Sequence, residues 1–509
     1  MKNIFLVLSI FLLYQLPVCA QYNSAVPGFI RDSLDQYISK AMADWQIPGM
    51  AIGIIKDGKI VELKGFGYLG MNRKEPVNEQ SLFMIGSNTK AFTATALAML
   101  EADQKCSLND KVVRWLPEFK MIDPWLNKEV SLTDLLCHRI GMQSYQGDFM
   151  YWASNLTRKQ VMEKFGKLSP AYGFRSRYGY TNAGFLIAGE CIGRISGTSW
   201  EHYLKNRIFM PLQMTRTQAL SKDFSNQENS SSAYTMKNDS LIEIPIGDID
   251  NLNAAGSMGS SASDMCHWLL CQLDSGRYEG KQVIPFRVVE KTRTPQTFVG
   301  VSRRPFNNSH FALYGLGWRL MDYEGKEIIA HAGAVDGFHS SVSLLPEIGL
   351  GIVIITNTDV NDFYEALKWD VIDAYLNLPS RNYSQVYLKK TQLARMKEHE
   401  LRRAWNDSVN LKPAPAFKLE KYTGTYSNKV YGNLYITNDS GKLLIHFEHH
   451  PNLTGLLECI GGNRFLCTYS NPEFGIKVLN FESSKKNPVS IIVRVSEDID
   501  NSPYNFKKK

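Results

Sequence analysis

Hydrophobic and polar residues follow two different periods along the first 380 residues of this 509-residue chain. Apolar side chains recur at helical spacing over residues 27–45, which predicts an amphipathic helix. Two apolar runs follow at 50–56 and 59–64, and the Asp-Gly pair between them predicts a strand hairpin with a tight turn. Residues 88–101 are rich in Ala and Leu and predict a second helix.

A second pair of apolar runs lies at 339–345 and 350–356, and a further helix is predicted over 361–377. Strands near both ends of this region, with a helical middle between them, predict an α/β domain whose C-terminal strands close its sheet. We place this domain at residues 21–380.

The pattern changes beyond this domain. Residues 381–412 form a charged connector that is predicted to be helical over 385–408. The sequence Pro-Ala-Pro follows the connector and marks a break in regular secondary structure. Short strand-like runs divided by Asn, Gly, Ser and Pro come next: Tyr422–Tyr426, Asn433–Thr437, Lys442–Phe447, Arg464–Tyr469, Ile476–Phe481 and Val489–Val495. Such runs predict a small antiparallel β-barrel over residues 413–509.

Composition and charge narrow the function classes. With 44% hydrophobic and 21% charged residues, the chain has the composition of a globular protein, which excludes disordered, collagen-like and coiled-coil classes. Lys and Arg exceed Asp and Glu by 57 − 50 = 7, and the excess is spread along the chain apart from runs at 389–403 and 507–509. A basic stripe interleaved with aromatic residues is typical of nucleic-acid-binding proteins. The chain has no such stripe in its sequence, so we expect no nucleic-acid partner.

The first twenty residues read as a secretory signal peptide. One Lys precedes an apolar run, and small residues favour cleavage between Ala20 and Gln21, which predicts export to the periplasm or the extracellular space. The alternative is a lipoprotein signal with Cys19 lipidated, which the bulky Val18 disfavours. No later run approaches 18 apolar residues, so we expect no membrane span.

The cysteines and histidines give no metal-site spacing. Seven cysteines remain after the signal peptide, and of these Cys459 and Cys467 would face each other across a hairpin, which allows one disulfide. On one strand, His446, Glu448 and His450 would share a face and hold a metal, but no partner cluster accompanies them. We expect no metal ion.

The first motif with candidate chemistry is Ser87-Asn88-Thr89-Lys90, which precedes the Ala-rich helix. Three residues of helix bring Ser87 and Lys90 to one face. A serine hydroxyl needs a neighbouring base, and a desolvated lysine has a pKa low enough to accept its proton. The simpler interpretation is that Ser87 only caps the helix, and the same spacing recurs at Ser483–Lys486.

Two further motifs follow, each weak by itself. In Tyr180-Thr181-Asn182, a phenol near a lysine can move a proton and an amide can bind substrate. His331-Ala332-Gly333 lies on a predicted strand, where the glycine allows close backbone approach by a ligand. The alternative for both motifs is ordinary packing, since a single Tyr or His is usually a packing residue in or near the hydrophobic core.

In this order, the three motifs resemble the serine β-lactamase and penicillin-binding-protein superfamily, in particular the branch of class C β-lactamases, D-alanyl-D-alanine carboxypeptidases, D-aminopeptidases and related esterases. The resemblance extends over residues 30–380 and includes IPGMAIGIIKDGKIVELKGFGY, VSLTDLLCHRIGM, AAGSMGSSASDM, YGLGW and HAGAVDGFHS. It implies an α/β fold with an antiparallel sheet flanked by helices and a helical subdomain. The barrel resembles a lipocalin-like accessory domain, which begins at residues 417–428.

The resemblance implies catalytic roles for three residues. Ser87 would be the nucleophile, Lys90 the base that activates it, and Tyr180 the group that moves the proton to the leaving group. Whether Lys90 or Tyr180 is the proximate base stays open. The implied reaction is acyl transfer through a serine ester followed by hydrolysis, without a metal or an organic cofactor.

The resemblance also implies a substrate-binding set. Asn182 would position the substrate, and His331 and Gly333 would line the facing strand. The backbone N–H groups of Ser87 and Ala334 would form the oxyanion hole. Penicillin-binding members carry Lys-Thr-Gly where this chain has His-Ala-Gly, and a neutral histidine binds a substrate carboxylate less well.

The predicted function is therefore that of an exported serine hydrolase of small peptide or D-amino-acid amides or esters. β-Lactamase or D-alanyl-D-alanine carboxypeptidase activity is the alternative, and a catalytically silent sensor of cell-wall fragments is another. The segment Leu135–Gly141 departs from the family pattern Leu-x-x-His-x-Ser-Gly, which we interpret as a matter of packing. The barrel would cap the mouth of the site or drive oligomerisation, and the oligomeric state stays open.

Overall fold

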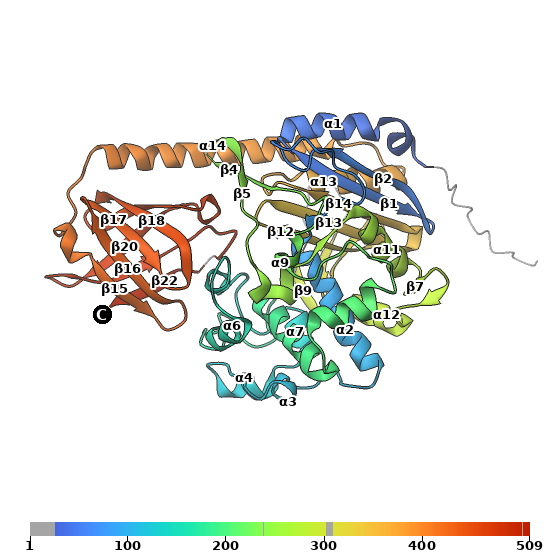
Figure 1. Cartoon of the computed structure of the whole chain (residues 1–509), viewed down its shortest axis with the longest axis horizontal. Helices are drawn as coiled ribbons and strands as arrows, with labels where there is room; N and C mark the ends of the chain where they lie inside the picture. The colour runs from blue at the N-terminus through green and yellow to red at the C-terminus, as the bar shows by residue number, and fades with distance from the viewer. Residues whose placement is uncertain (1–25, 238, 302–308, 501) are drawn as a thin grey trace, which may run out of the picture.

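The computed structural model describes residues 26–237, 239–301, 309–500 and 502–509, so the predicted signal peptide and Cys19 lie outside the described residues. Two bodies are joined by a long helix, with a mixed α/β body at one end and a barrel at the other (Figure 1). In the described part of the chain, no helix combines the length and the apolar character that crossing a membrane requires.

The α/β body is built on an eight-stranded antiparallel sheet with the order β2-β1-β14-β13-β12-β11-β10-β9. Its strands are β1 (Gly49–Lys56), β2 (Lys59–Gly67), β9 (Thr297–Val301), β10 (Phe311–Tyr314), β11 (Arg319–Tyr323), β12 (Lys326–Val335), β13 (Phe338–Leu345) and β14 (Leu350–Thr356). Both predicted hairpins, β1–β2 and β13–β14, are present, and β14 lies beside β1, the second strand from one edge of the sheet.

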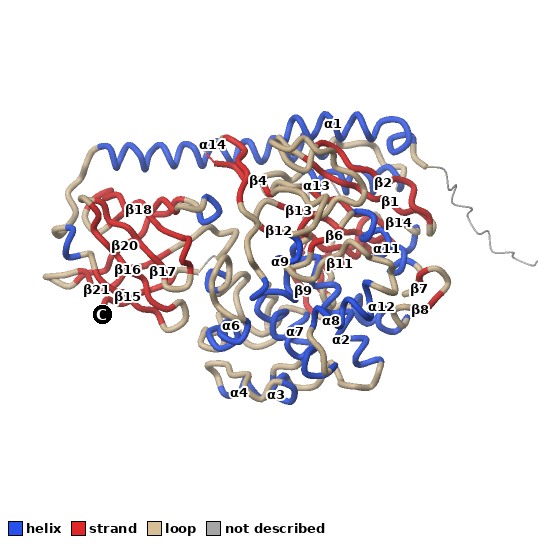
Figure 2. The backbone as a smooth tube through the Cα atoms, in the orientation of Figure 1, coloured by secondary structure: helices blue, strands red, loops and turns tan. Residues whose placement is uncertain are grey.

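Both faces of this sheet are covered, which explains why its central strands are continuous apolar runs. In β1, Met50, Ile52 and Ile54 pack into the core under α1 (Leu34–Trp45) and α13 (Phe363–Tyr375). The alternate residues Ala51 and Ile55 pack into the core that contains α2 (Thr89–Ala102) and α11 (Ala262–Leu273). The sheet therefore separates two helical layers (Figure 2).

The predicted first helix begins with a π-helical turn, Phe29–Ser33, before α1. The remaining helices are α3 (Val112–Trp115), α4 (Pro124–Glu129), α5 (Leu132–Leu136), α6 (Arg158–Phe165), α7 (Asn182–Ser196), α8 (Trp200–Leu204), α9 (Ser221–Phe224), α10 (Asn253–Gly256) and α12 (Phe286–Arg293). Short strand pairs complete the body: β3 (Phe83–Met84) with β6 (Gly259–Ser260), β4 (Ala233–Lys237) with β5 (Ser240–Ile244), and β7 (Arg277–Tyr278) with β8 (Lys281–Gln282).

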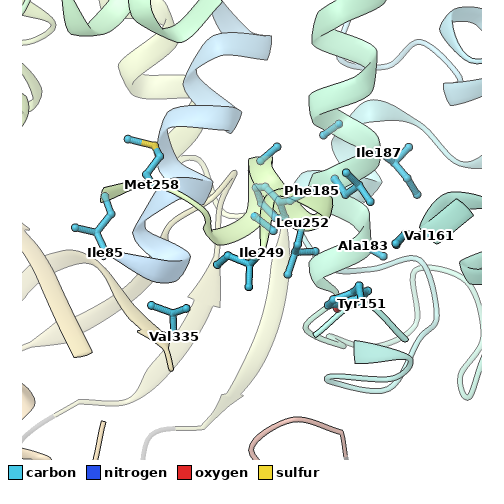
Figure 3. Packing of buried hydrophobic residues seen from close by; sticks show 14 of the residues in the cluster. Ile85, Tyr151, Val161, Ala183, Phe185, Ile187, Ile249, Leu252, Met258 and Val335 are labelled. Carbon is cyan, nitrogen blue, oxygen red and sulfur yellow. The ribbon is translucent and has the colours of Figure 1, made fainter. Parts of the chain in front are cut away.

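Helix α2 is buried on all sides along most of its length, from Thr89 to Leu100. Figure 3 shows the apolar contacts near its first turn, where Ile85 and Val335 approach from the sheet side and Phe185 from α7. Packing of this kind fixes the direction of the first turn of α2 relative to the sheet and to α7.

Helix α14 (Tyr383–Asn410) covers the segment predicted to be a helical connector. The barrel that follows is closed, and its strands are β15 (Gly424–Asn428), β16 (Gly432–Asp439), β17 (Lys442–Phe447), β18 (His450–Gly461), β19 (Arg464–Tyr469), β20 (Ile476–Ser483), β21 (Pro488–Val493) and β22 (Tyr504–Lys508). The predicted fold class, an antiparallel sheet flanked by helices and followed by a small barrel, is confirmed. The sequence pattern missed β18, which contains Pro and Gly, and β22, which is short and rich in Lys.

Two predictions for the barrel are wrong. The register of β18 and β19 places Cys459 opposite Phe465 and Cys467 opposite Leu457, and both thiols are free, so no disulfide joins them. His446 and His450 do not share one strand face, because β17 ends at Phe447 and the chain turns before β18. Among the described residues, no group of three or more His, Cys, Asp and Glu side chains has an arrangement that would hold a metal ion.

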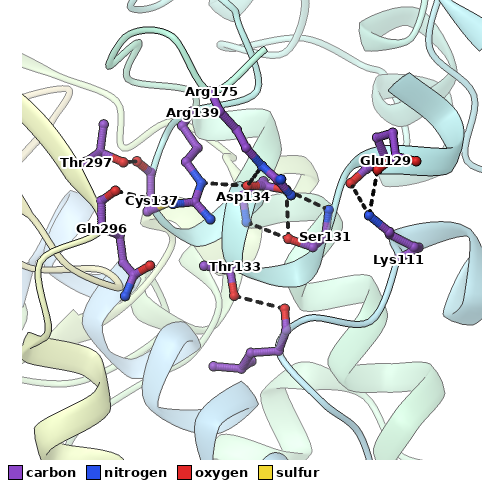
Figure 4. Close-up of polar contacts among 11 residues, drawn as sticks. Lys111, Glu129, Ser131, Thr133, Asp134, Cys137, Arg139, Arg175, Gln296 and Thr297 are labelled. Carbon is purple, nitrogen blue, oxygen red and sulfur yellow. Dashed lines mark hydrogen bonds and ion pairs between the residues drawn. The ribbon is translucent and has the colours of Figure 1, made fainter. Parts of the chain in front are cut away.

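A buried carboxylate stabilises the turn that follows α5 (Figure 4). Asp134 is fully buried, receives hydrogen bonds from Arg139 (2.6 Å) and Arg175 (2.9 and 2.7 Å), and completes a capping box with Ser131. Burial acts to raise the pKa of Asp134, but the hydrogen bonds from Arg175, Ser131 and Arg139 outweigh it and lower that pKa below its ordinary value.

Replacing Asp134 with Ala is expected to lower the free energy of unfolding by about 1.5–3 kcal/mol, because charged hydrogen bonds are lost while both arginines still reach solvent. Since the pKa is lower in the folded state, the stabilisation is present above the unfolded value of about 4 and is lost as the pH falls through the folded value. Urea unfolding at neutral and acidic pH measures this, with the exposed Asp32→Ala as a control that changes little. A loss that does not shrink at acidic pH would contradict the role of the ionised carboxylate.

Candidate active site

Ser87 lies in a short 3-10 turn, Gly86–Asn88, that leads directly into α2. The Nζ of Lys90 lies 2.9 Å from the Ser87 Oγ and donates a 2.8 Å hydrogen bond to the carbonyl oxygen of Ala255. Ser87 is half-buried, whereas Lys90 has no exposed surface. The sequence spacing therefore brings hydroxyl and amine into direct contact.

The environment of Lys90 favours the neutral amine. Burial lowers the pKa of Lys90 well below its ordinary value, and it outweighs the charge of Asp148, which acts to raise that pKa; the charge of Arg319 adds a smaller lowering effect. A neutral amine has a free lone pair, so the 2.9 Å contact also suits a hydrogen bond donated by the Ser87 hydroxyl to Nζ. This is the geometry required of a general base.

Tyr180 stands beside Lys90, just before α7, and its side chain is nearly buried. Its ring centroid lies 4.8 Å from the Lys90 Nζ. Burial above all raises the pKa of Tyr180 well above its ordinary value, while the hydroxyl of Ser87 acts in the opposite direction. The phenol is therefore protonated near neutral pH and can donate a proton.

Asn182, the first residue of α7, is held by a carboxyl group that the sequence did not single out. Its Nδ2 donates a 2.6 Å hydrogen bond to the Oδ2 of Asp148, whose Oδ1 accepts from the hydroxyl of Tyr151. Asp148 is buried, and burial together with the neighbouring Asp500 raises its pKa well above the ordinary value. Asp148 lies in a long loop without periodicity, so no sequence signal identified it.

The third motif, His331-Ala332-Gly333, lies on β12, which passes close to the turn that contains Ser87. The His331 Nε2 lies 2.9 Å from the hydroxyl of Tyr314 and its Nδ1 lies 2.7 Å from the Ala332 carbonyl oxygen. Burial lowers the pKa of His331 well below its ordinary value, so the imidazole is neutral. With Nδ1–H donating to the carbonyl, Nε2 accepts from the phenol.

The glycine of this motif allows another backbone segment to approach closely. A Cβ at Gly333 would lie 1.9 Å from the carbonyl oxygen of Ile85, and a Cβ at Gly86 would lie 2.8 Å from the backbone nitrogen of Ala334. The close approach thus joins β12 to the turn that contains Ser87. It places the N–H groups of Ser87 and Ala334, the predicted oxyanion hole, on neighbouring segments.

Two more residues of the site escaped the sequence interpretation. His138 stacks near Tyr180, with ring centroids 4.3 Å apart, and its Nδ1 accepts the N–H of Thr181 at 3.0 Å. The Leu135–Gly141 segment was predicted to serve only packing of the helical region. Through His138 it also contacts Tyr180 directly. Arg319, at the start of β11, lies with its Cζ 6.0 Å from the Tyr180 ring centroid and brings a permanent positive charge to the site.

These residues open into a cavity of about 670 Å³ that both bodies line. Ser87, Tyr180, Asn182, Arg319, His331 and Gly333 contribute from the α/β body, Arg395 from α14, and Glu473 and Asp498 from the barrel. The volume is in the range of small-molecule and short-peptide sites. The barrel thus forms part of the wall of the cavity that Ser87 lines.

Comparisons with known proteins agree with this arrangement. The chain matches the Beta-lactamase family over residues 34–377 and a domain of unknown function, DUF3471, over residues 410–508. It is 26% identical over 448 residues to "Unguisins hydrolase ungD'" of Aspergillus campestris, covering 83% of this chain and 81% of that protein. It is 25% identical over 329 residues to "Protein flp" of Staphylococcus aureus, covering 64% of this chain and 63% of that protein.

Solved structures share the fold. The octameric penicillin-binding protein homologue from Pyrococcus abyssi superimposes with a TM-score of 0.59 at 20% identity, covering 93% of this chain and 99% of that chain. A D-stereospecific amidohydrolase from Streptomyces superimposes with a TM-score of 0.53 at 24% identity, covering 67% of this chain and 96% of that chain. Since the family match extends over more than half of the chain, this protein belongs to the Beta-lactamase family, whose members are serine hydrolases.

Proposed function

We propose that this protein is an exported serine hydrolase that forms an acyl-enzyme on Ser87 and acts on short peptide amides or related esters. The observation that carries the proposal is the 2.9 Å contact between the Ser87 Oγ and the Nζ of a fully buried Lys90. Export rests on the predicted signal peptide at residues 1–20.

In the acylation step, the neutral Lys90 amine takes the proton of the Ser87 hydroxyl while Oγ attacks the substrate carbonyl carbon. The negative charge that develops on the carbonyl oxygen is stabilised by the N–H groups of Ser87 and Ala334. The protonated amine then returns its proton, through the Tyr180 hydroxyl, to the departing amine or alcohol. Lys90 is thus the proximate base, because burial favours both its neutral amine and a protonated Tyr180.

Hydrolysis of the ester follows the same route with water as the nucleophile. Water gives a proton to the regenerated Lys90 amine and attacks the ester carbonyl, and the Ser87 oxygen recovers its proton as it leaves. Asn182, held by Asp148, offers its amide oxygen to a substrate N–H in both steps. No residue outside this group is needed for proton balance.

The distribution of charge along β12 supports a peptide substrate with charged groups on both sides of the scissile bond. Arg319 pairs in register with Ala330, while Asp336 follows the end of the strand, and the nucleophile turn touches β12 between them. Six residues of strand span about 20 Å, the reach of a short extended peptide. Burial raises the pKa of Asp336 above its ordinary value, and the hydrogen bond from Trp152 acts in the opposite direction.

Intact-mass labelling with a fluorophosphonate and with a penicillin, in parallel, tests the proposal. We expect a fluorophosphonate adduct on the wild-type protein and none on Ser87→Ala. A penicillin adduct that Arg319→Gln diminishes would favour the alternative β-lactam and D-alanyl-D-alanine chemistry, because Arg319 would then replace the missing family lysine. Failure of both probes to label the wild-type protein would contradict a serine hydrolase and favour the silent sensor.

A further inference from the structure

Phe149 belongs to the α/β body, but its side chain is inserted into the barrel. Its ring stacks on His450 (centroids 4.4 Å apart) and on Tyr504 (5.3 Å). Three more barrel rings surround it, with centroid distances of 5.3, 5.8 and 6.0 Å: Phe447, Tyr431 and Phe474. Only 1% of Phe149 is exposed, so the barrel supplies an aromatic socket for this one side chain.

The barrel also holds the backbone two residues earlier. The N–H of Gly147 donates a 2.8 Å hydrogen bond to the Oδ2 of Asp500, a buried residue between β21 and β22. Gly147 has φ +91°, and a Cβ there would lie 2.6 Å from a methyl group of Leu168, so only glycine fits this conformation. The barrel therefore fixes the turn on both sides of Asp148.

Asp148 lies between Gly147 and Phe149, which contact the barrel, and its own side chain contacts α7 of the α/β body. Its Oδ2 accepts the 2.6 Å hydrogen bond from Asn182. The same segment is joined to Tyr180, because the N–H of Tyr145 donates to the Tyr180 carbonyl oxygen at 2.9 Å and the N–H of Tyr180 donates to Ser144 Oγ at 3.0 Å. A displacement of the turn at 147–150 would therefore act on Asn182, since the contacts with Tyr180 are made by residues 144 and 145, before this turn.

From this chain of contacts we infer that the barrel is a positioning element of the active site. Phe149 and Asp500 are positioning residues: they hold Asp148, which orients the amide of Asn182 toward the substrate. The inference rests on the proposed function, since it presumes that Asn182 binds the substrate amide. It differs from a cap at the mouth, which would select substrate size and leave the orientation of Asn182 unchanged.

A double-mutant cycle in the full-length protein tests this inference. Phe149→Ala is expected to lower kcat/KM for a peptide amide by about 10- to 100-fold, the range expected when a binding group shifts by about 1 Å. In an Asn182→Ala background, the same substitution should cause little further loss. Losses that multiply in the double variant would overturn the inference, because Phe149 would then act independently of Asn182.

Asp500 provides a second test that removes no ring of the aromatic socket. Asp500→Ala removes the acceptor for the Gly147 N–H and should reduce kcat/KM, whereas Asp500→Asn keeps an acceptor oxygen and should restore most of the activity.

Phe465→Ala is the matched control for Phe149→Ala, since this buried barrel ring contacts Tyr422 and Phe481 but not Phe149. Equal losses in Phe465→Ala and Phe149→Ala, or no loss in Asp500→Ala, would overturn the inference.

The fluorophosphonate labelling rate separates this inference from the proposed function. The probe reacts with Ser87 and carries no amide for Asn182 to bind, so the labelling rate should be similar in the wild type, Phe149→Ala and Asp500→Ala. A wild-type protein that is not labelled would count against the serine hydrolase itself. Equal labelling together with reduced peptide turnover is the result that the positioning role predicts.

Discussion

Replacing Ser87 with Ala is expected to reduce turnover by about 10⁴- to 10⁶-fold, because binding and the oxyanion hole alone leave only residual catalysis when a nucleophile is removed. The fold should be unaffected, since Ser87 is half-buried and Lys90 keeps its hydrogen bond to the Ala255 carbonyl oxygen. Steady-state hydrolysis of a panel of short peptide amides and esters measures the loss.

The chain contains its own control for this substitution. Ser483 and Lys486 repeat the Ser-x-x-Lys spacing in the barrel, where Ser483 is exposed at the end of β20 and accepts a hydrogen bond from Asn463. Ser483→Ala should retain full activity. Equal activity of Ser87→Ala and Ser483→Ala would remove the basis for an acyl-enzyme on Ser87.

Replacing Lys90 with Met is expected to lower the acylation rate by about 10²- to 10⁴-fold, the usual contribution of a general base. In the wild type, the rate should rise with pH as Lys90 loses its proton and then become constant. Because burial lowers the pKa of Lys90 well below 10.5, the constant region should begin at a lower pH than an ordinary lysine would give. Stopped-flow acylation across a pH series measures both effects, and a rising limb that persists in Lys90→Met would assign it to another group.

Lys90→Met should lower activity but raise the free energy of unfolding. A lysine whose pKa is lowered by folding takes up a proton when the chain unfolds, so it destabilises the fold at every pH below its unfolded value near 10.4. Lys90→Met removes this cost and keeps the volume of the side chain, and should therefore unfold at a higher urea concentration than the wild type at pH 7. If both effects are observed, Lys90 would be an instance of the trade-off between activity and stability.

Local patterns predicted the parts of the fold that depend on neighbours in sequence. The hairpins β1–β2 and β13–β14 followed from apolar runs on either side of turn residues. The contact between Ser87 and Lys90 followed from helical spacing, because three residues of helix place two side chains on one face.

The parts that depend on long-range packing could not be read from those patterns. Asp148 and Phe149 sit in a loop without a hydrophobic period, and their partners come from α7 and the barrel. Arg319 reaches the site only because β11 lies beside β12 in the sheet. The register of β18 with β19, which pairs Cys459 with Phe465 and Cys467 with Leu457, likewise decided that the two hairpin cysteines do not meet.

The position of β14 beside β1 has a consequence for the order in which the molecule forms. Met50 pairs with Thr356, so the β1–β14 pair cannot form until most of the chain has been synthesised, and closing so long a loop is slow. Glu473 and Asp498 of the cavity wall come later still. A ribosome-bound or prematurely terminated chain would carry the nucleophile without its cavity, and hydrolytic activity would arise only in the finished molecule.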